Sequence, residues 1–301
     1  MNEAPHLSIV IPVYRSAASL AELHARIAAV CTHIDVTFEL ICANDASPDD
    51  SWRVLCDLHA QDARVKCINL ARNFGQHPAL LCGLAHAQGQ YVLTMDDDLQ
   101  HPPEEIPVLL NAIQNDPDTD VYIGSYTVKQ HNWFRNLGTA VINWATTRIF
   151  NKDPHLRLTS FRIMRRPVVE ALLRYTTESP RVGQLMLMST NRIRNVPVRH
   201  APRAHGRSGY TLRRLIKDFL DNILSNSTLP LSFVMGVGFS LAGLSFLLAL
   251  VYVYKYFVRG VSVSGWTTLV LLLLFFFGVL FFVMGIIGEY LIRILREARK
   301  N

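Results

Sequence analysis

Apolar and polar positions alternate in two recurring patterns from residue 7 to residue 124. Short β-branched runs predict strands over 7–13, 38–43, 65–70, 91–95 and 121–124. Between them, apolar residues recur at helical spacing over 19–31, 49–59, 78–87 and 104–115. Strands that alternate with helices are typical of parallel βαβ units, so we predict an α/β fold with a doubly wound, Rossmann-like sheet.

A different pattern occupies the last third of the chain. Residues 229–254 contain no charged side chain, and neither do residues 260–288. Each run exceeds the roughly 20 residues that cross a bilayer as a helix. Two transmembrane helices, about 229–254 and 261–288, are therefore predicted to form a hairpin. The alternative is a buried helical pair in a soluble core, which is disfavoured because residues 269–283 are apolar on all faces.

Charge indicates how this hairpin is oriented. The formal net charge is +6, and basic residues flank both runs, whereas the loop between them contains only Lys255 and Arg259. Both ends of the hairpin are therefore expected in the cytoplasm, and the basic residues that flank it are expected to contact anionic membrane lipids. Nucleic-acid binding could also explain the charge, but we recognise no nucleic-acid module, so we expect no nucleic-acid partner.

The predicted domains follow from these patterns. We expect a cytoplasmic domain over 1–228, a membrane domain over 229–292 and a basic cytoplasmic tail over 293–301. Residues 133–150 and 210–224 mix aromatic, aliphatic and basic residues at helical spacing. They predict interfacial helices on the membrane, or alternatively amphipathic helices packed on the sheet. The five cysteines all precede residue 83 without metal-ligand spacing, so we expect reduced core residues.

Three polar clusters follow predicted strands. Tyr14 follows the first strand, Asp45 the second, and Asp96, Asp97 and Asp98 the fourth. Adjacent carboxylates repel one another, and a bound Mg²⁺ or Mn²⁺ would remove that cost. A solvated acidic turn before a helix is the alternative. Because ligands bind beyond the carboxyl ends of parallel strands, the convergence of three clusters favours an active site.

Several segments together resemble a known family. They are 8–14 (SIVIPVY), 44–51 (NDASPDDS), 70–77 (LARNFGQH), 96–104 (DDDLQHPPE), 203–210 (RAHGRSGY) and 285–290 (GIIGEY). In this order the chain resembles the family 2 glycosyltransferases of GT-A fold. It is most similar to the membrane-anchored polyprenyl-phosphate glycosyltransferases, which include dolichyl-phosphate mannose synthase, bactoprenol glucosyltransferases and, nearest, the undecaprenyl-phosphate formamido-arabinose transferase.

The resemblance implies an inverting transferase that uses Mg²⁺ or Mn²⁺. It would move a sugar from a nucleotide-sugar donor, with UDP favoured, to undecaprenyl phosphate at the cytoplasmic face of a bacterial inner membrane. The product would serve cell-envelope glycan synthesis or lipid A modification. Relatives suggest a homo-oligomer packed through the spans. The alternatives are another lipid or polysaccharide acceptor, and a non-catalytic nucleotide-binding membrane protein.

The resemblance also implies roles for individual residues. The nucleotide would contact Pro12, Tyr14, Asp45 and Asp96. Metal binding would fall to Asp96, Asp98 and Gln100. The phosphates of donor and acceptor would face Arg135, Arg203 and Ser208. The implied catalytic set is Asp96, Asp98, Arg135 and Arg203.

Four positions depart from the family pattern. Asn44 stands where many relatives have an Asp, and Asp97 occupies the usually small middle position of the Asp-x-Asp motif. Ser160 stands where several relatives carry an Asp that has been proposed as catalytic, and Gly209 replaces a common Lys. A serine is a poor base, so Ser160 leaves open whether that role is dispensable here.

Overall fold

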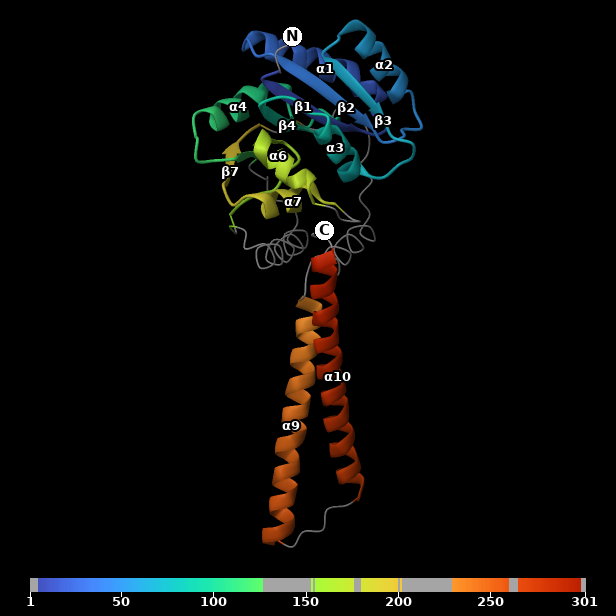
Figure 1. The fold of residues 1–301 in the computed structure, drawn as a ribbon, viewed down its shortest axis with the longest axis vertical. Helices are drawn as coiled ribbons and strands as arrows, with labels where there is room; N and C mark the ends of the chain where they lie inside the picture. Colours follow the sequence, from blue (N-terminus) through green and yellow to red (C-terminus); the bar gives the residue numbers. More distant parts are fainter. Residues whose placement is uncertain are drawn as a thin grey trace. The chain divides into compact units, whose positions relative to one another are not determined.

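The computed structural model describes residues 5–126, 153, 155–175, 180–199, 201, 229–259 and 265–298. Figure 1 shows the fold. The strands are β1 Leu7–Val13, β2 Phe38–Asn44, β3 Val65–Asn69, β4 Tyr91–Thr94, β5 Val121–Ser125, β6 Arg162–Arg165 and β7 Ile193–Pro197. The helices are α1 Ala17–His33, α2 Ser51–Gln61, α3 Gln76–Ala85, the 3₁₀ helix η1 Pro103–Glu105, α4 Ile106–Gln114, α6 Arg166–Leu173, α7 Val182–Ser189, α9 Leu229–Arg259 and α10 Gly265–Ala298.

The strands described form one mostly parallel sheet in the order β3-β2-β1-β4-β6-β5-β7. β1 pairs in parallel with both β2 and β4, which places the carboxyl ends of these three strands at one edge. β6 is antiparallel to β4 and to β5. The predicted α/β fold is confirmed. Strands β6 and β7 and helices α6 and α7 lie beyond the elements that the sequence pattern predicted.

Helices cover both faces of the sheet. Leu7, Ile9 and Ile11 on β1 point into a core shared with α1, α2 and α4. Val10 points to the opposite face, into a core shared with α3, α6 and α7. This alternation follows the two-residue period of a strand. On the second face α3 approaches β1 closely, because a β carbon at Gly83 would lie 2.4 Å from a Val10 methyl group.

The chain divides into two compact units, Met1–Gly209 and Tyr210–Asn301. In the second unit α9 and α10 run side by side (Figure 1). Within α9, Gly236–Lys255 is long and apolar enough to cross a membrane, with a mean hydropathy of 2.0. The apolar stretch found in α10, Leu272–Gly288, is shorter. One span is thus supported among the described residues, and the second span and the domain boundary at 228/229 stay predictions.

Small residues allow α9 and α10 to pack closely. A β carbon at Gly278 would lie 2.6 Å from the Ala242 backbone nitrogen, and one at Gly238 would lie 2.8 Å from the Phe282 nitrogen. Large apolar side chains face outward instead, and Phe239 is 68% exposed while Phe276 is 63% exposed. Close backbone approach through small residues is a common way for helices to associate in lipid.

One expectation about the cysteines is wrong. All five are described and all are free thiols, but Cys56 is exposed on α2. Cys31 and Cys42 are buried as predicted, and Cys67 and Cys82 are half-buried. The helical face of Cys56 is turned to solvent because α2 buries Ser51, Leu55 and Leu58 instead.

The close packing of α9 and α10 gives a first prediction. Gly278→Val would place side-chain atoms against the Ala242 backbone, and such overpacking costs about 1–3 kcal/mol. We expect a lower melting temperature for the helical circular dichroism signal of the detergent-purified protein. The control is Gly243→Val, because no atom lies within 4 Å of a β carbon built there. Equal melting temperatures for the two variants would contradict the packing.

Candidate active site

The loops that follow β1, β2 and β4 meet at one edge of the sheet. Tyr14 follows β1 directly, Asp45 follows β2, and Asp96 lies two residues beyond β4. The convergence expected from the sequence is therefore present. It results from the parallel pairing of β1 with its two neighbours, which aligns their carboxyl ends.

The half-buried carboxylate of Asp97 joins the first and last of these loops. Oδ2 of Asp97 accepts hydrogen bonds from the Tyr14 backbone N–H at 3.1 Å and from the Ser16 hydroxyl. The Asp97 carbonyl accepts another from the Ser19 hydroxyl at 2.7 Å. Burial raises the pKa of Asp97 to about 6, although the two hydrogen bonds to its carboxylate act in the opposite direction. Asp97 is thus a structural link and not an outward-facing ligand.

Asp45 shapes the loop between β3 and α3. Its two carboxylate oxygens accept hydrogen bonds from the backbone N–H groups of Phe74 at 2.7 Å and Gly75 at 2.8 Å. Gly75 has a φ of 97°, which a residue with a side chain rarely adopts. Asn44, the departure noted beside it, donates from Nδ2 to Oδ1 of Asn69 at 2.8 Å and so ties β2 to β3.

The predicted Asp-x-Asp carboxylates differ in their surroundings. Asp96 accepts hydrogen bonds from Gln76 Nε2 at 2.7 Å and from the Ser160 hydroxyl at 2.5 Å. Oδ1 of Asp98 accepts a hydrogen bond from the Gln100 backbone N–H at 3.2 Å. Leu99, between Asp98 and Gln100, is buried and has a φ of 61°, so a tight turn sets this end of the loop.

Charged and titratable side chains lie behind Asp96. Arg162 on β6 is only 3% exposed and donates from Nε to the Thr94 hydroxyl at 3.2 Å. Burial lowers the pKa of Arg162 to about 10, and the nearby Asp96 charge opposes this, so the guanidinium stays charged at neutral pH. Burial, with Arg162 and Arg181, lowers the pKa of His77 to about 4. His77 is therefore neutral at pH 7 and is poorly suited to act as a general acid.

The residues present suit a hard divalent cation. Among the described residues no group of three or more His, Cys, Asp or Glu side chains is arranged to enclose a metal ion. Asp96, Asp98 and Gln100 nevertheless offer carboxylate and amide oxygens from one short loop, the donor type that Mg²⁺ and Mn²⁺ prefer. Oxygens from a bound diphosphate would be needed to complete the coordination. The donor set therefore fits a cation that binds together with its substrate.

The remaining predicted site residues divide into two groups. Pro12 is buried within β1, opposite Ala43, and Tyr14 is 42% exposed with the Arg15 guanidinium over its ring. Arg135, Arg203 and Ser208 lie outside the described residues, as do both predicted interfacial stretches, 133–150 and 210–224. The backbone N–H of Ala201, two residues before Arg203 in the sequence, donates to the Gln100 carbonyl at 3.0 Å.

Sequence reasoning gave no role to Gln76, and it questioned Ser160 without identifying its partner. Both side chains contact Asp96. Gln76 lies inside the Asn-Phe-Gly-Gln-His segment, and Ser160 occupies a position already noted as unusual. The sequence therefore marked both positions, but it does not reveal that two segments 84 residues apart meet at the Asp96 carboxylate.

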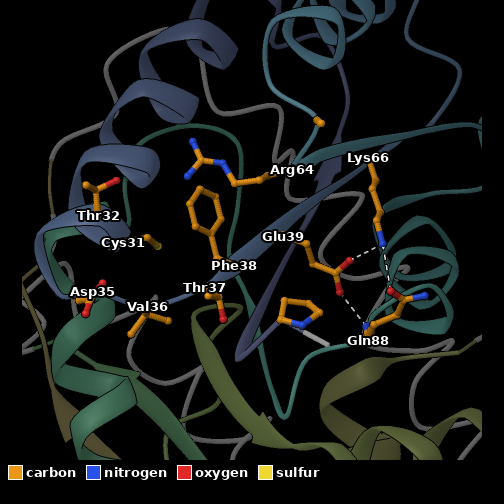
Figure 2. Close-up of a pocket in the computed structure, with 12 residues that line it drawn as sticks. Cys31, Thr32, Asp35, Val36, Thr37, Phe38, Glu39, Arg64, Lys66 and Gln88 are labelled. Carbon is orange, nitrogen blue, oxygen red and sulfur yellow. Dashed lines mark hydrogen bonds and ion pairs between the residues drawn. The ribbon is translucent and has the colours of Figure 1, made fainter. Parts of the chain in front are cut away.

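A separate cavity of about 820 Å³ lies at the amino ends of the strands. Figure 2 shows Glu39 there, joined to both Lys66 and Gln88. The Lys66 ammonium lies 2.5 Å from Glu39 Oε2, and the Gln88 backbone N–H donates to Oε1 at 2.7 Å. Burial disfavours the Glu39 charge, but these partners outweigh it and lower its pKa. The carboxylate is thus satisfied by the protein itself, on the edge opposite the candidate active site.

Comparison with known proteins agrees with this fold. Residues 8–173 match glycosyl transferase family 2. Proteins named undecaprenyl-phosphate 4-deoxy-4-formamido-L-arabinose transferase match along nearly the whole chain. The one from Sodalis glossinidius is 33% identical over 97% of this chain and 90% of its own length. The one from Pseudomonas fluorescens is 36% identical over 97% of this chain and 87% of its own length.

Solved structures show the same fold. The crystal structure of glucosyl-3-phosphoglycerate synthase from Mycobacterium tuberculosis, in complex with Mn²⁺ and UDP-glucose, has a TM-score of 0.54 and 18% identity. The match covers 73% of this chain and 77% of that chain. The chain belongs to glycosyl transferase family 2. It is a glycosyltransferase, and the GT-A fold expected from the resemblance is confirmed.

The half-buried Asp97 carboxylate gives a second prediction. Its folded-state pKa of about 6 exceeds the ordinary 3.8, so the native state holds this proton more tightly than the unfolded chain. This contribution to stability is fully present below about pH 4 and is lost as pH rises through 6. Asp97→Asn keeps an oxygen to accept hydrogen bonds from Tyr14 and Ser16 but removes the half-buried charge. We expect this variant to be more stable than wild type at pH 8, by on the order of 1 kcal/mol.

The measurement is denaturant unfolding of the protein in EDTA between pH 4 and pH 8. A plot of unfolding free energy against pH should be flatter for Asp97→Asn than for wild type across this range. Asp57→Asn, an exposed carboxylate change on α2, is the matched control and should follow wild type. Parallel curves for wild type and Asp97→Asn would show that the Asp97 charge is not destabilised in the fold.

Proposed function

We propose that this glycosyltransferase moves a sugar from a nucleotide-sugar, with UDP as the favoured nucleotide, to undecaprenyl phosphate with inversion at the anomeric carbon. One observation carries the proposal. The loop with Asp96, Asp98 and Gln100 is joined through Asp97 to the loop with Tyr14, beside Asp45. The proposed diphosphate and nucleoside sites would thus share one edge of the sheet.

The nucleotide end is formed by two loops. Tyr14 is exposed and offers an aromatic face for a base, while the Arg15 guanidinium lies 5.3 Å from the ring centroid. Asp45 has both carboxylate oxygens bound to the Phe74–Gly75 backbone, so we assign it to shaping the base and ribose pocket. Pro12 is buried in β1 and would act on the nucleotide only by fixing the start of the Tyr14 loop.

The diphosphate end is formed by the loop after β4. Asp96, Asp98 and Gln100 would hold Mg²⁺ or Mn²⁺ together with diphosphate oxygens. When bound, the cation neutralises the charge that develops on the departing nucleoside diphosphate. The chain's own contribution is to orient these oxygens, through the turn at Leu99 and through the hydrogen bonds to Asp96.

The acceptor is proposed from the relatives and from its chemistry. The relatives' shared name specifies undecaprenyl phosphate and a formamido-arabinose. An acceptor phosphate oxygen would form a bond to the anomeric carbon while the bond from that carbon to the diphosphate breaks. A phosphate monoester is an anion near neutral pH, so this attack needs little help from a base. It needs alignment of two anions, which we assign to Arg135, Arg203 and Ser208.

The membrane setting fits a lipid acceptor. α9 contains a stretch that could span a bilayer, and its outward side chains are large and apolar. We infer a multi-pass protein of the bacterial inner membrane, with its catalytic domain in the cytoplasm and its basic flanks against anionic lipids. A homo-oligomer packed through the spans belongs to the same proposal.

Removing Asp98 tests the activity. We expect Asp98→Ala to lower transfer of labelled sugar to undecaprenyl phosphate by at least about 100-fold, because stabilising the leaving group is worth several kcal/mol. EDTA should abolish the wild-type reaction, and Mg²⁺ or Mn²⁺ should restore it. Product is measured as lipid-linked sugar by mass spectrometry, with a panel of nucleotide-sugars as donors.

The control for this experiment is Asp57→Ala, which removes an exposed carboxylate from α2 and should retain wild-type transfer. Absence of product with every donor would refute the proposed acceptor and donor classes. Full activity of Asp98→Ala would refute the role of the loop after β4.

A further inference from the structure

Both oxygens of the Asp96 carboxylate are bound by neutral side chains. Gln76, the first residue of α3, donates from Nε2 to Oδ1 at 2.7 Å. Ser160, two residues before β6, donates from its hydroxyl to Oδ2 at 2.5 Å. Each donor occupies one oxygen, so together they fix the rotation of the carboxylate and leave its other lone pairs available to a ligand.

Ser160 is itself held in place by a hydrogen bond to strand β4. Its carbonyl accepts a hydrogen bond from the Thr94 hydroxyl at 2.6 Å. The same Thr94 oxygen accepts a hydrogen bond from Nε of the buried Arg162. Thr94 and Arg162 are partners in the antiparallel pairing of β4 and β6. The position of Ser160 is therefore set by the sheet and not by a mobile loop.

Arg162 adds an electrostatic contribution. It is 3% exposed, and among the described residues no carboxylate forms an ion pair with it within 4.0 Å. Asp96 is the acidic group whose charge acts on it most strongly. The positive charge of Arg162 therefore attracts the Asp96 carboxylate. Three neighbours, Gln76, Ser160 and Arg162, thus act on Asp96 without adding negative charge to the site.

We propose that Gln76 and Ser160 are positioning residues, which orient Asp96 toward the divalent cation and the donor diphosphate, and that Ser160 does not act as a base. This inference rests on the proposed function. The Ser160 hydroxyl donates a hydrogen bond to Asp96. An acceptor phosphate that is already an anion requires no base at this position. Outer partners of this kind commonly change metal affinity by about 10–100-fold.

Aspartate at position 160 would repel the Asp96 carboxylate, whereas the serine hydroxyl binds it. A second carboxylate in place of the serine hydroxyl would face Asp96 at hydrogen-bond distance, where two like charges repel and one of them must take up a proton. If this position instead supplies a general base, the same substitution would create one. Ser160→Asp therefore separates the two roles.

The experiment uses the full-length protein in detergent and has two readouts. Calorimetry with UDP measures the Mn²⁺ concentration that gives half-maximal nucleotide binding, and transfer assays measure kcat at saturating Mn²⁺ as a function of pH. The variants are Ser160→Ala, Ser160→Thr, Ser160→Asp and Gln76→Ala. Thr159→Val is the matched control, because the Thr159 hydroxyl donates to the Gly124 carbonyl and does not contact Asp96.

Ser160→Ala and Gln76→Ala should each raise the Mn²⁺ requirement about 10-fold. Their kcat at saturating Mn²⁺ should stay within about threefold of wild type, with an unchanged pH profile. Ser160→Thr keeps the hydroxyl and should restore Mn²⁺ dependence, while Ser160→Asp should weaken binding further. Thr159→Val should show wild-type Mn²⁺ dependence even if its melting temperature falls.

Two results would overturn the inference. One is an unchanged Mn²⁺ requirement in Ser160→Ala and Gln76→Ala. The other is a higher kcat in Ser160→Asp together with a new ionisation in its pH profile, which would identify position 160 as a place for a base. Because binding of UDP and Mn²⁺ is measured without an acceptor, failure of the wild-type protein to transfer a sugar refutes the proposed function separately.

Discussion

The half-buried carboxylate of Asp97 connects the two loops on which the site depends. It accepts the Tyr14 N–H and the Ser16 hydroxyl from the loop after β1, and it belongs to the loop after β4. An ionised carboxylate is costly to bury, and burial accordingly raises its pKa to about 6. The hydrogen bonds offset part of this cost and hold the loops after β1 and β4 together, and these loops carry the proposed nucleotide and diphosphate sites.

The same edge concentrates negative charge before any ligand binds. Each carboxylate is stabilised by a different set of hydrogen-bond donors. Asp45 accepts hydrogen bonds from backbone N–H groups of a glycine-containing loop, and Asp96 accepts them from neutral side chains. Asp98 accepts one from a backbone N–H within its own tight turn. Because these donors are uncharged, they stabilise the carboxylates without neutralising the negative charge that a divalent cation would bind. Among the described residues, Arg162 is a buried cation behind these loops, and its charge attracts the Asp96 carboxylate.

Part of this organisation could be predicted from the sequence alone. The five strands that end near residues 13, 44, 69, 94 and 125 were predicted because each is a short apolar run between helical patterns. Strands β6 and β7 were not predicted, since sequences such as RIMR and IRNVP lack the apolar alternation of an isolated strand. Their strand conformation is stabilised by partners distant in the chain, β6 by β4 and β7 by β5.

The sequence by itself determined the parallel α/β fold, the apolar segment of α9 and the edge of the sheet where Tyr14, Asp45 and Asp96 converge. These follow from local periodicity and from the order of strands and helices. Only the tertiary structure decided what each carboxylate does there. Asp97 became an internal link, and Asp96 became the carboxylate held by Gln76 and Ser160. The reason is physical: hydrogen bonds between segments tens of residues apart depend on strand pairing and register, which no local pattern specifies.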